Sequence, residues 1–181
     1  MTDLNFSSRQ DRLASTQPEG EHPPEPNWDI IELLFFAYRD FVSDPDDALA
    51  RFNFGRAHHR VLHFVNRNPG MKVADLLDIL KITKQSLGRV LKQLVDQGYV
   101  EQREGENDRR QRLLYATGKG EALAMKLAGL QTERISRALA ELGPGAHEAA
   151  RNFLIAMIDA EGRSGVKELI ARADHIRKAK L

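Results

Sequence analysis

The stretch MKVADLLDILKITKQSLGRVLKQLVDQGYVEQREGENDRRQRLLYATGKG, residues 71–120, decides the fold. A short helix is expected from Met71 to Leu80, because apolar residues recur there on one helical face. The residues of that face are Val73, Leu76, Leu77 and Leu80. A tight connection, Lys81-Ile82-Thr83, leads to a second helix, and Thr83 is suited to begin it because its hydroxyl can accept an unpaired backbone N–H.

The second helix has an apolar face and a polar face. The apolar residues are Leu87, Val90, Leu91, Leu94 and Val95. At about 100° per residue, the opposite face holds Gln85, Arg89, Lys92 and Gln93, with Ser86 at its flank near the start of the helix. Arginine pairs with guanine and glutamine with adenine in the major groove, whereas serine and lysine bind phosphates or base edges. The residues of this helix predicted to contact DNA are Thr83, Lys84, Gln85, Ser86, Arg89 and Lys92.

Gly88 lies within this second helix, where glycine costs about 1 kcal/mol of helix stability relative to alanine. Two explanations are open at this point. Either a DNA backbone approaches the helix closely at Gly88, or the glycine allows tight packing inside the domain.

A hairpin follows Gly98, which is expected to end the helix. The expected strands are Tyr99–Arg103 and Arg112–Tyr115, and the loop between them is Glu104–Gln111. Arg109 or Arg110 at the tip can enter a narrow minor groove, where the negative potential is deepest. Asp108 is expected to pair with a neighbouring arginine and so to fix the loop. The residues of the hairpin predicted to contact DNA are Asp108, Arg109, Arg110 and Arg112.

The order of these elements is more specific than any one of them, because a polar helix face or a basic hairpin alone is usually a solvated surface. Together they predict a mainly α protein with a small β-hairpin wing, in which residues 67–116 form a winged helix-turn-helix domain that binds double-stranded DNA. An adaptor whose winged helix binds protein is the alternative. Such an adaptor would expose apolar residues where Gln85, Arg89 and Lys92 stand.

The chain resembles the MarR-type winged-helix regulators from about Trp28 to Gly162. The motifs that carry the resemblance are Asn68-Pro69-Gly70, Val73–Leu77, Ile82–Leu87, Leu94–Val100, Asp108-Arg109-Arg110 and Thr117–Gly120. The segment from Phe52 to Tyr99 is most similar to PetP-like members, while Ala116 replaces the usual leucine. The resemblance implies a two-fold homodimer formed by the terminal helices, which binds a pseudo-palindromic DNA site and is often released by a small-molecule effector.

The residues flanking the DNA-binding domain, 27–66 and 117–162, are expected to form a helical dimerisation domain. The first helix of this scaffold is apolar nearly all round up to a break at Ser43–Asp47, and a second is expected over Ala48–Asn66. A helix that is apolar on every side needs burial on more than one side, so a partner subunit is expected.

Three further segments complete the organisation. Two helices are expected over Thr117–Leu142 and Ala146–Gly162, separated by a Gly-Pro-Gly turn. Residues 1–26 contain four prolines among polar residues and are predicted to be a disordered N-terminal arm. Residues 163–181 are predicted to be a C-terminal amphipathic tail.

Composition excludes several classes of protein. The absence of cysteine excludes disulfides and thiolate metal sites. The sequence has no secretory signal and no apolar run of about 18 residues, so a cytoplasmic location without a membrane span is expected. It has no phosphate-binding loop, nucleophile motif or zinc-protease signature, so no enzymatic activity is expected. Net charge is only +1, but residues 81–119 hold nine basic and five acidic residues, a local excess that suits DNA binding.

Two clusters have weaker functional interpretations. His59 and His63 lie four residues apart next to His58 and could share a zinc ion, but no third ligand is evident and hydrogen-bonded histidines are more common. Neither a metal nor a cofactor is therefore predicted. The phenylalanines that could line an effector pocket are Phe35, Phe36, Phe41, Phe52 and Phe54, although core or dimer contacts would explain most of them.

Overall fold

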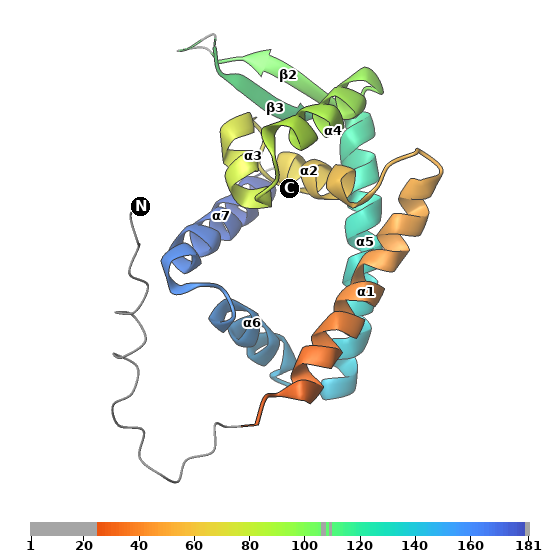
Figure 1. Ribbon diagram of the computed structural model, residues 1–181, viewed down its shortest axis with the longest axis vertical. Helices are drawn as coiled ribbons and strands as arrows, with labels where there is room; N and C mark the ends of the chain where they lie inside the picture. Colours follow the sequence, from red (N-terminus) through yellow and green to blue (C-terminus); the bar gives the residue numbers. More distant parts are fainter. Residues whose placement is uncertain (1–24, 106–107, 109, 180–181) are drawn as a thin grey trace, which may run out of the picture.

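The computed structural model describes residues 25–105, 108 and 110–179 of the chain. Its elements in chain order are α1 (Trp28–Ala50), α2 (Arg56–Arg67), β1 (Met71–Lys72), α3 (Val73–Leu80), α4 (Lys84–Asp96), β2 (Val100–Glu104), β3 (Arg112–Ala116), α5 (Gly118–Leu142), α6 (Ala146–Ala156) and α7 (Ala160–Lys178). Figure 1 shows α2, α3, α4 and the sheet at one end of the molecule, while α1 and α5 run side by side away from them. The mainly α fold with a small wing is confirmed.

The sheet has three antiparallel strands in the order β1-β3-β2. The hairpin of β2 and β3 was predicted, but β1 was not, because Met71 and Lys72 were expected to begin a helix. Gly70 turns the chain with a φ of 80° and donates its N–H to the Leu114 carbonyl at 2.9 Å. This turn sets Met71 opposite Leu114, where both side chains are buried, so pairing with β3 replaces the first helical turn.

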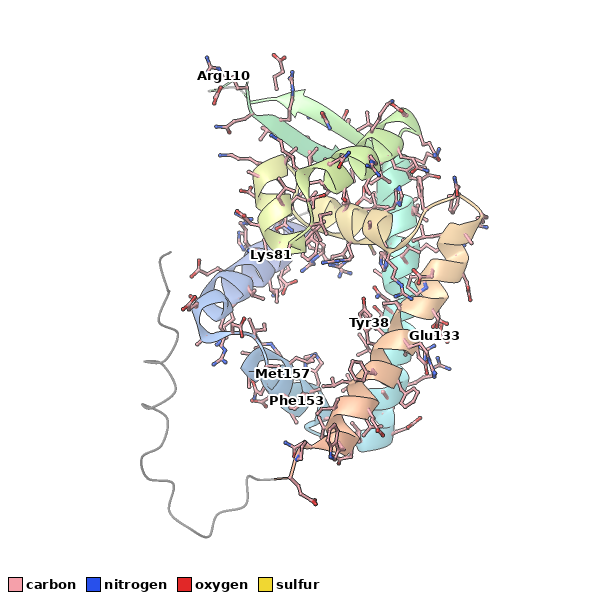
Figure 2. All side chains as sticks on the ribbon, viewed as in Figure 1. Tyr38, Lys81, Arg110, Glu133, Phe153 and Met157 are labelled. Carbon is pink, nitrogen blue, oxygen red and sulfur yellow. The ribbon has the colours of Figure 1, made fainter. Side chains whose placement is uncertain are left out.

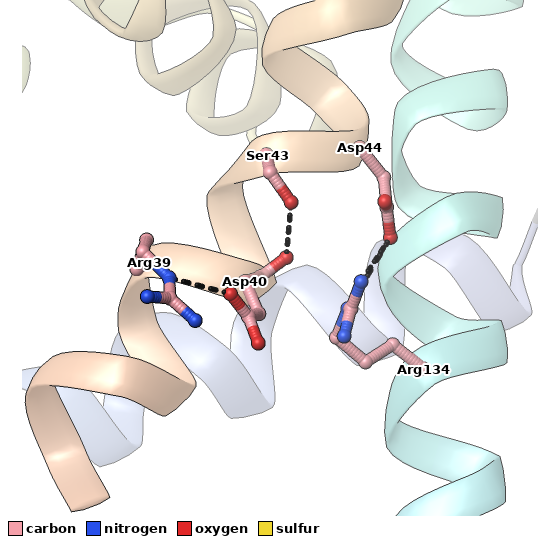
Figure 3. A network of polar contacts seen from close by, with 5 residues as sticks. All are labelled: Arg39, Asp40, Ser43, Asp44 and Arg134. Carbon is pink, nitrogen blue, oxygen red and sulfur yellow. Dashed lines mark hydrogen bonds and ion pairs between the residues drawn. The ribbon is translucent and has the colours of Figure 1, made fainter.

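The predicted break at Ser43–Asp47 is wrong, because α1 continues through it to Ala50 with Pro45 inside the helix. Proline has no N–H to donate to the carbonyl four residues earlier, so α1 lacks one helical hydrogen bond here. Pro45 is fully buried, and the Ser43 hydroxyl donates to the Asp40 carbonyl at 2.9 Å. Asp44 pairs with Arg134 of α5 at 2.8 Å, which fastens α1 across the proline (Figure 3).

The true break lies at residues 51–55, and α2 consequently begins at Arg56 and not at Ala48. Asn53 adopts a φ of 56° there, in the left-handed region that asparagine tolerates better than most residues.

The C-terminal helices also differ from expectation. The helix predicted to reach Gly162 ends at Ala156, where the Arg163 guanidinium donates to the carbonyls of Ala156 and Ile158, both at 2.9 Å. Most of the predicted amphipathic tail, from Arg163 to Lys178, belongs to the 19-residue helix α7, which begins at Ala160. Burial of Ala173 and an ion pair between Asp174 and Arg67 at 2.6 Å hold α7 against α2.

One core joins the end that holds α2, α3, α4 and the sheet to the long helices. Its fully buried leucines are Leu49, Leu62, Leu76, Leu87, Leu94, Leu114 and Leu127. Gly120 at the start of α5 is essential to this junction, because a Cβ added there would lie 2.0 Å from the Tyr99 carbonyl oxygen. Among the helices formed by the described residues, none has the length and apolarity to cross a membrane.

Candidate nucleic-acid interface

The helix α4 begins as the sequence predicted. Thr83 is its N-cap, with extended backbone geometry, and its Oγ1 accepts the backbone N–H of Ser86 at 3.1 Å. The Thr83 hydroxyl in turn donates to Ser86 Oγ at 2.9 Å. The backbone of the first turn of α4, where side chains reach base edges in helix-turn-helix proteins, is therefore stabilised by its own cap.

The polar face of α4 is open to solvent. Its exposed residues are Lys84, Gln85, Ser86, Arg89 and Lys92. The opposite face buries Leu87, Val90, Leu91 and Leu94, as predicted, and Val95 is half-buried. Lys92 pairs with Asp96 at 2.5 Å, whereas no carboxylate among the described residues pairs with Lys84 or Arg89.

Gln93 does not belong to this open face, contrary to the sequence interpretation. It is half-buried, its Oε1 lies 2.8 Å from His58 Nε2, and its Nε2 donates to the Asn53 carbonyl at 3.1 Å. Helical spacing places a residue on a face of α4 but contains no information about the loop at 51–55, which covers that part of the face.

Gly88 is exposed on α4, and a Cβ built there meets no atom within 4 Å. Of the two explanations that the sequence left open, tight packing inside the domain is therefore wrong for the described part of the chain. Close approach of a partner molecule to Gly88 remains a prediction.

The wing consists of β2, β3 and the loop between them, and Figure 2 shows Arg110 at its tip. In the described part of this loop, the carboxylate of Asp108 accepts the backbone N–H of Arg110 at 2.9 Å and the side-chain amide of Gln111 at 3.4 Å. Arg110 therefore binds Asp108 through its backbone N–H and not through its guanidinium. Arg112 pairs with Glu104 across the strands at 2.9 Å. Arg109 lies outside the described residues.

A cavity of about 410 Å³ lies between α1, α2 and α5. Its lining residues are Tyr38, Phe41, Val42, Arg56, His59, Arg60, His63, Phe64 and Gln131. Arg56 is paired with Asp46 at 2.7 Å, and Arg60 donates to the Leu80 carbonyl at 3.2 Å. Burial lowers the pKa of His59 and His63 from the ordinary histidine value, and for His63 the charges of His59 and Arg67 add to this effect.

Only one of the five phenylalanines considered for an effector pocket, Phe41, lines this cavity. Phe35 and Phe36 are exposed on α1, and no other described part of the chain covers their rings. Phe52 and Phe54 pack instead around Tyr99, with ring centroids 6.1 and 5.1 Å from it.

The histidines of α2 form no metal site in the described part of the chain. Both ring nitrogens of His58 are engaged, since Nδ1 accepts the Gly55 N–H at 3.1 Å and Nε2 contacts Gln93. His59 and His63 face the cavity, where the structure offers no third ligand among the described residues.

Comparison with known proteins places this geometry in a family. A model of the MarR family matches residues 52–111. The chain is 48% identical to the HTH-type transcriptional regulator PetP of Rhodobacter capsulatus over 129 residues, which cover 71% of this chain and 78% of PetP. The chain belongs to the MarR family of transcription regulators. These are DNA-binding proteins without enzymatic activity, in agreement with the sequence expectation.

Solved structures of MarR regulators share the fold. A MarR regulator from Methanosarcina mazei Go1 has a TM-score of 0.62 at 22% identity, covering 79% of this chain and 93% of that one. The MepR–DNA complex from S. aureus has a TM-score of 0.56 at 16% identity, covering 70% of this chain and 94% of that one.

This MarR-family chain also has apolar surface that nothing in its described part covers. The exposed large apolar residues include Trp28, Leu33, Phe35, Phe36 and Tyr38 on α1, Phe153 and Leu154 on α6, and Met157 just after α6. Figure 2 marks Tyr38 on α1, Phe153 on α6 and Met157 just after α6. Such an extent of apolar surface is typical of an interaction surface.

The cavity contains residues that sequence reasoning missed, chiefly Tyr38, Arg56 and Arg60. A signal was available, because Arg56, His59, Arg60 and His63 recur at the spacing of one helical face. The sequence does not show that this face of α2 lies against α1 and Gln131 of α5, where it forms one wall of the cavity.

Proposed function

We propose that this MarR-family regulator acts as a homodimer that reads a pseudo-palindromic site in double-stranded DNA through α4 and the wing. The observation that carries the proposal is the exposed polar face of α4, set on a buried leucine face and stabilised at its start by the Thr83 cap. The proposed base-reading residues are Gln85, Ser86 and Arg89, and the proposed phosphate contacts come from Thr83, Lys84 and Lys92. A DNA complex is known for the structural neighbour MepR.

The wing supplies the second proposed contact. Arg110 stands at its tip and binds Asp108 through its backbone N–H, so its guanidinium can enter the minor groove beside the site that α4 reads. Arg112 is tied to Glu104 and contributes a phosphate contact at the base of the wing. Arg109 is included in the proposal on its sequence position alone.

The exposed apolar surface of α1 and α6 supports the homodimer. Trp28 is 63% exposed and Phe35 is 71% exposed, and leaving side chains of this size in water is unfavourable by about 1.5–3 kcal/mol each. We propose that a two-fold partner covers them and that the dimer presents its two copies of α4 to successive major grooves of DNA, about 34 Å apart. We propose that the regulator acts in the cytoplasm.

We further propose that a small effector binds in the cavity between α1, α2 and α5. Its lining combines the aromatic rings of Tyr38, Phe41 and Phe64 with the guanidinium groups of Arg56 and Arg60. This combination suits an aromatic anion. The lowered pKa values of His59 and His63 keep these two rings neutral near pH 7, so the positive charge comes from Arg60 and from Arg56, whose charge Asp46 partly compensates.

Selection of bound sequences from random double-stranded DNA tests the proposal with the purified full chain. We expect an enriched palindrome with half-sites one helical turn apart, and sedimentation of a dimer with and without the selected DNA. Failure to enrich any sequence would favour the protein-binding adaptor and overturn the proposed reading of DNA. Enrichment of a single half-site by a monomer would overturn the homodimer alone.

A further inference from the structure

The contact between His58 of α2 and Gln93 of α4 joins the helix that lines the cavity to the helix that faces DNA. We propose that His58 and Gln93 are positioning residues that fix the rotation of α4 on α2, and thereby the spacing of half-sites that the dimer accepts. This inference rests on the proposed function.

The hydrogen bonds around the pair have one consistent direction. The Gly55 N–H donates to His58 Nδ1 at 3.1 Å, so Nδ1 carries no proton and the ring proton is on Nε2. His58 Nε2 therefore donates to Gln93 Oε1 at 2.8 Å, and Gln93 Nε2 donates to the Asn53 carbonyl at 3.1 Å. Both ends of this chain of hydrogen bonds lie in the loop at 51–55, so His58 of α2 and Gln93 of α4 are both bonded to the same loop.

Packing holds the histidine ring in place. Its centroid lies 4.7 Å from that of Phe54, with an angle of 11° between the two rings. Phe54 is itself buried and meets Tyr99 edge-on at 5.1 Å, just before β2. Because the ring is stacked on a core residue and bonded through both nitrogens, it offers Gln93 a fixed anchor.

Among the described residues, Gln93 has the only side chain of α4 that hydrogen-bonds beyond the helix and its Thr83 cap. The inner face of α4 is made of leucine and valine, and apolar contacts have no directional preference. Hydrogen bonds do, and they weaken steeply when the donor angle departs from linearity. Gln93 lies one helical turn after Arg89, so a rotation of α4 permitted by loss of this bond would carry the proposed reading residues with it. In a two-fold dimer both copies would move, and their separation would change.

The test measures the preference for spacing and not affinity alone. The selected palindrome is synthesised with its spacer unchanged, shortened or lengthened by one base pair, and the wild-type chain and its variants are titrated against each DNA. For Gln93→Leu we expect the preference for the original spacer to fall about 3- to 10-fold, the effect of losing one hydrogen bond of ordinary strength. Gln97→Leu is the matched control, since Gln97 is exposed on the same helix end and should leave the preference unchanged.

Two substitutions at His58 separate positioning from stability. His58→Gln can still donate to Gln93 and should retain the wild-type spacing preference, whereas His58→Asn can still accept the Gly55 N–H but does not reach Gln93, and should lose it. Thermal melting of each variant reports stability separately. A merely structural role would lower binding to the DNAs with all three spacers equally, and this result would overturn the inference. An unchanged preference for the original spacer in Gln93→Leu or His58→Asn would overturn it too. If Gln93→Leu does not fold, the two His58 variants decide. If the wild-type chain selects no palindrome, the proposed function fails first, which is a distinguishable outcome.

Discussion

Replacing Gly88 by alanine should make the protein more stable and its binding to DNA weaker. The residue lies in the interior of the 13-residue helix α4, is exposed, and has no atom within 4 Å of an added Cβ. The methyl group therefore causes no clash in the described chain. The free energy of unfolding should rise by about 1 kcal/mol, the helix preference of alanine over glycine. For a chain of this length the melting temperature should rise by about 2–4 °C.

The expected loss of DNA affinity follows from the position of Gly88 on the helix. Lys84 and Lys92 lie one turn before and one turn after it on the same exposed face, so Gly88 forms a notch between two cations. A deoxyribose-phosphate strand seated in that notch would be displaced by a methyl group. Overpacking of this kind costs about 1–3 kcal/mol, so the dissociation constant should rise at least about fivefold.

Melting curves and fluorescence anisotropy with the selected DNA measure the two effects separately. Gly165→Ala in α7 is the matched control, because Gly165 is also helical, exposed and free of atoms within 4 Å of an added Cβ. It should produce the same gain in stability with no change in DNA binding. Unchanged DNA affinity in Gly88→Ala, together with the gain in stability, would refute the close approach of DNA to this residue.

Three further predictions concern the interface and the cavity. Arg89→Ala should lose about 1–3 kcal/mol of specific binding and relax the preference at one base pair, as measured by repeated selection; an unchanged selected sequence would remove Arg89 from the reading residues. Arg110→Ala should reduce the steepness of the plot of log affinity against log salt concentration by about one unit, because one phosphate contact is lost. An unchanged slope would assign that phosphate contact to another residue. The lowered pKa values of His59 and His63 mean that the unfolded chain gains protons first as pH falls below about 6.5, so the free energy of unfolding should decrease there. Urea titrations across that range should show a smaller decrease for His63→Gln, and an equal decrease would assign the effect to other groups.

The sequence was sufficient for α4 and the hairpin because their signals are local. Thr83 caps the helix that follows it, and the apolar spacing of α4 matches its buried face. The predictions were wrong where residues far away in the sequence determine the local structure. Pro45 stays helical where it is fully buried and where Arg134 of α5 pairs with the adjacent Asp44, a contact between residues 90 positions apart. Gln93 is withdrawn from the open face of α4 by a loop 40 positions earlier in the chain. Helical periodicity has no access to such contacts.

The helix α2 lies between the two proposed binding functions. Arg56 and His59 line the cavity on one side, while His58 between them bonds to α4. An effector that shifted α2 would therefore move α4 through His58 and Gln93. Such a shift weakens DNA binding only if the effector binds the shifted arrangement more tightly, and a tenfold loss of DNA affinity requires about 1.4 kcal/mol of such difference. Because this coupling is reciprocal, bound DNA must reduce effector affinity by the same factor, and loss of the bond in Gln93→Leu should reduce both effects together.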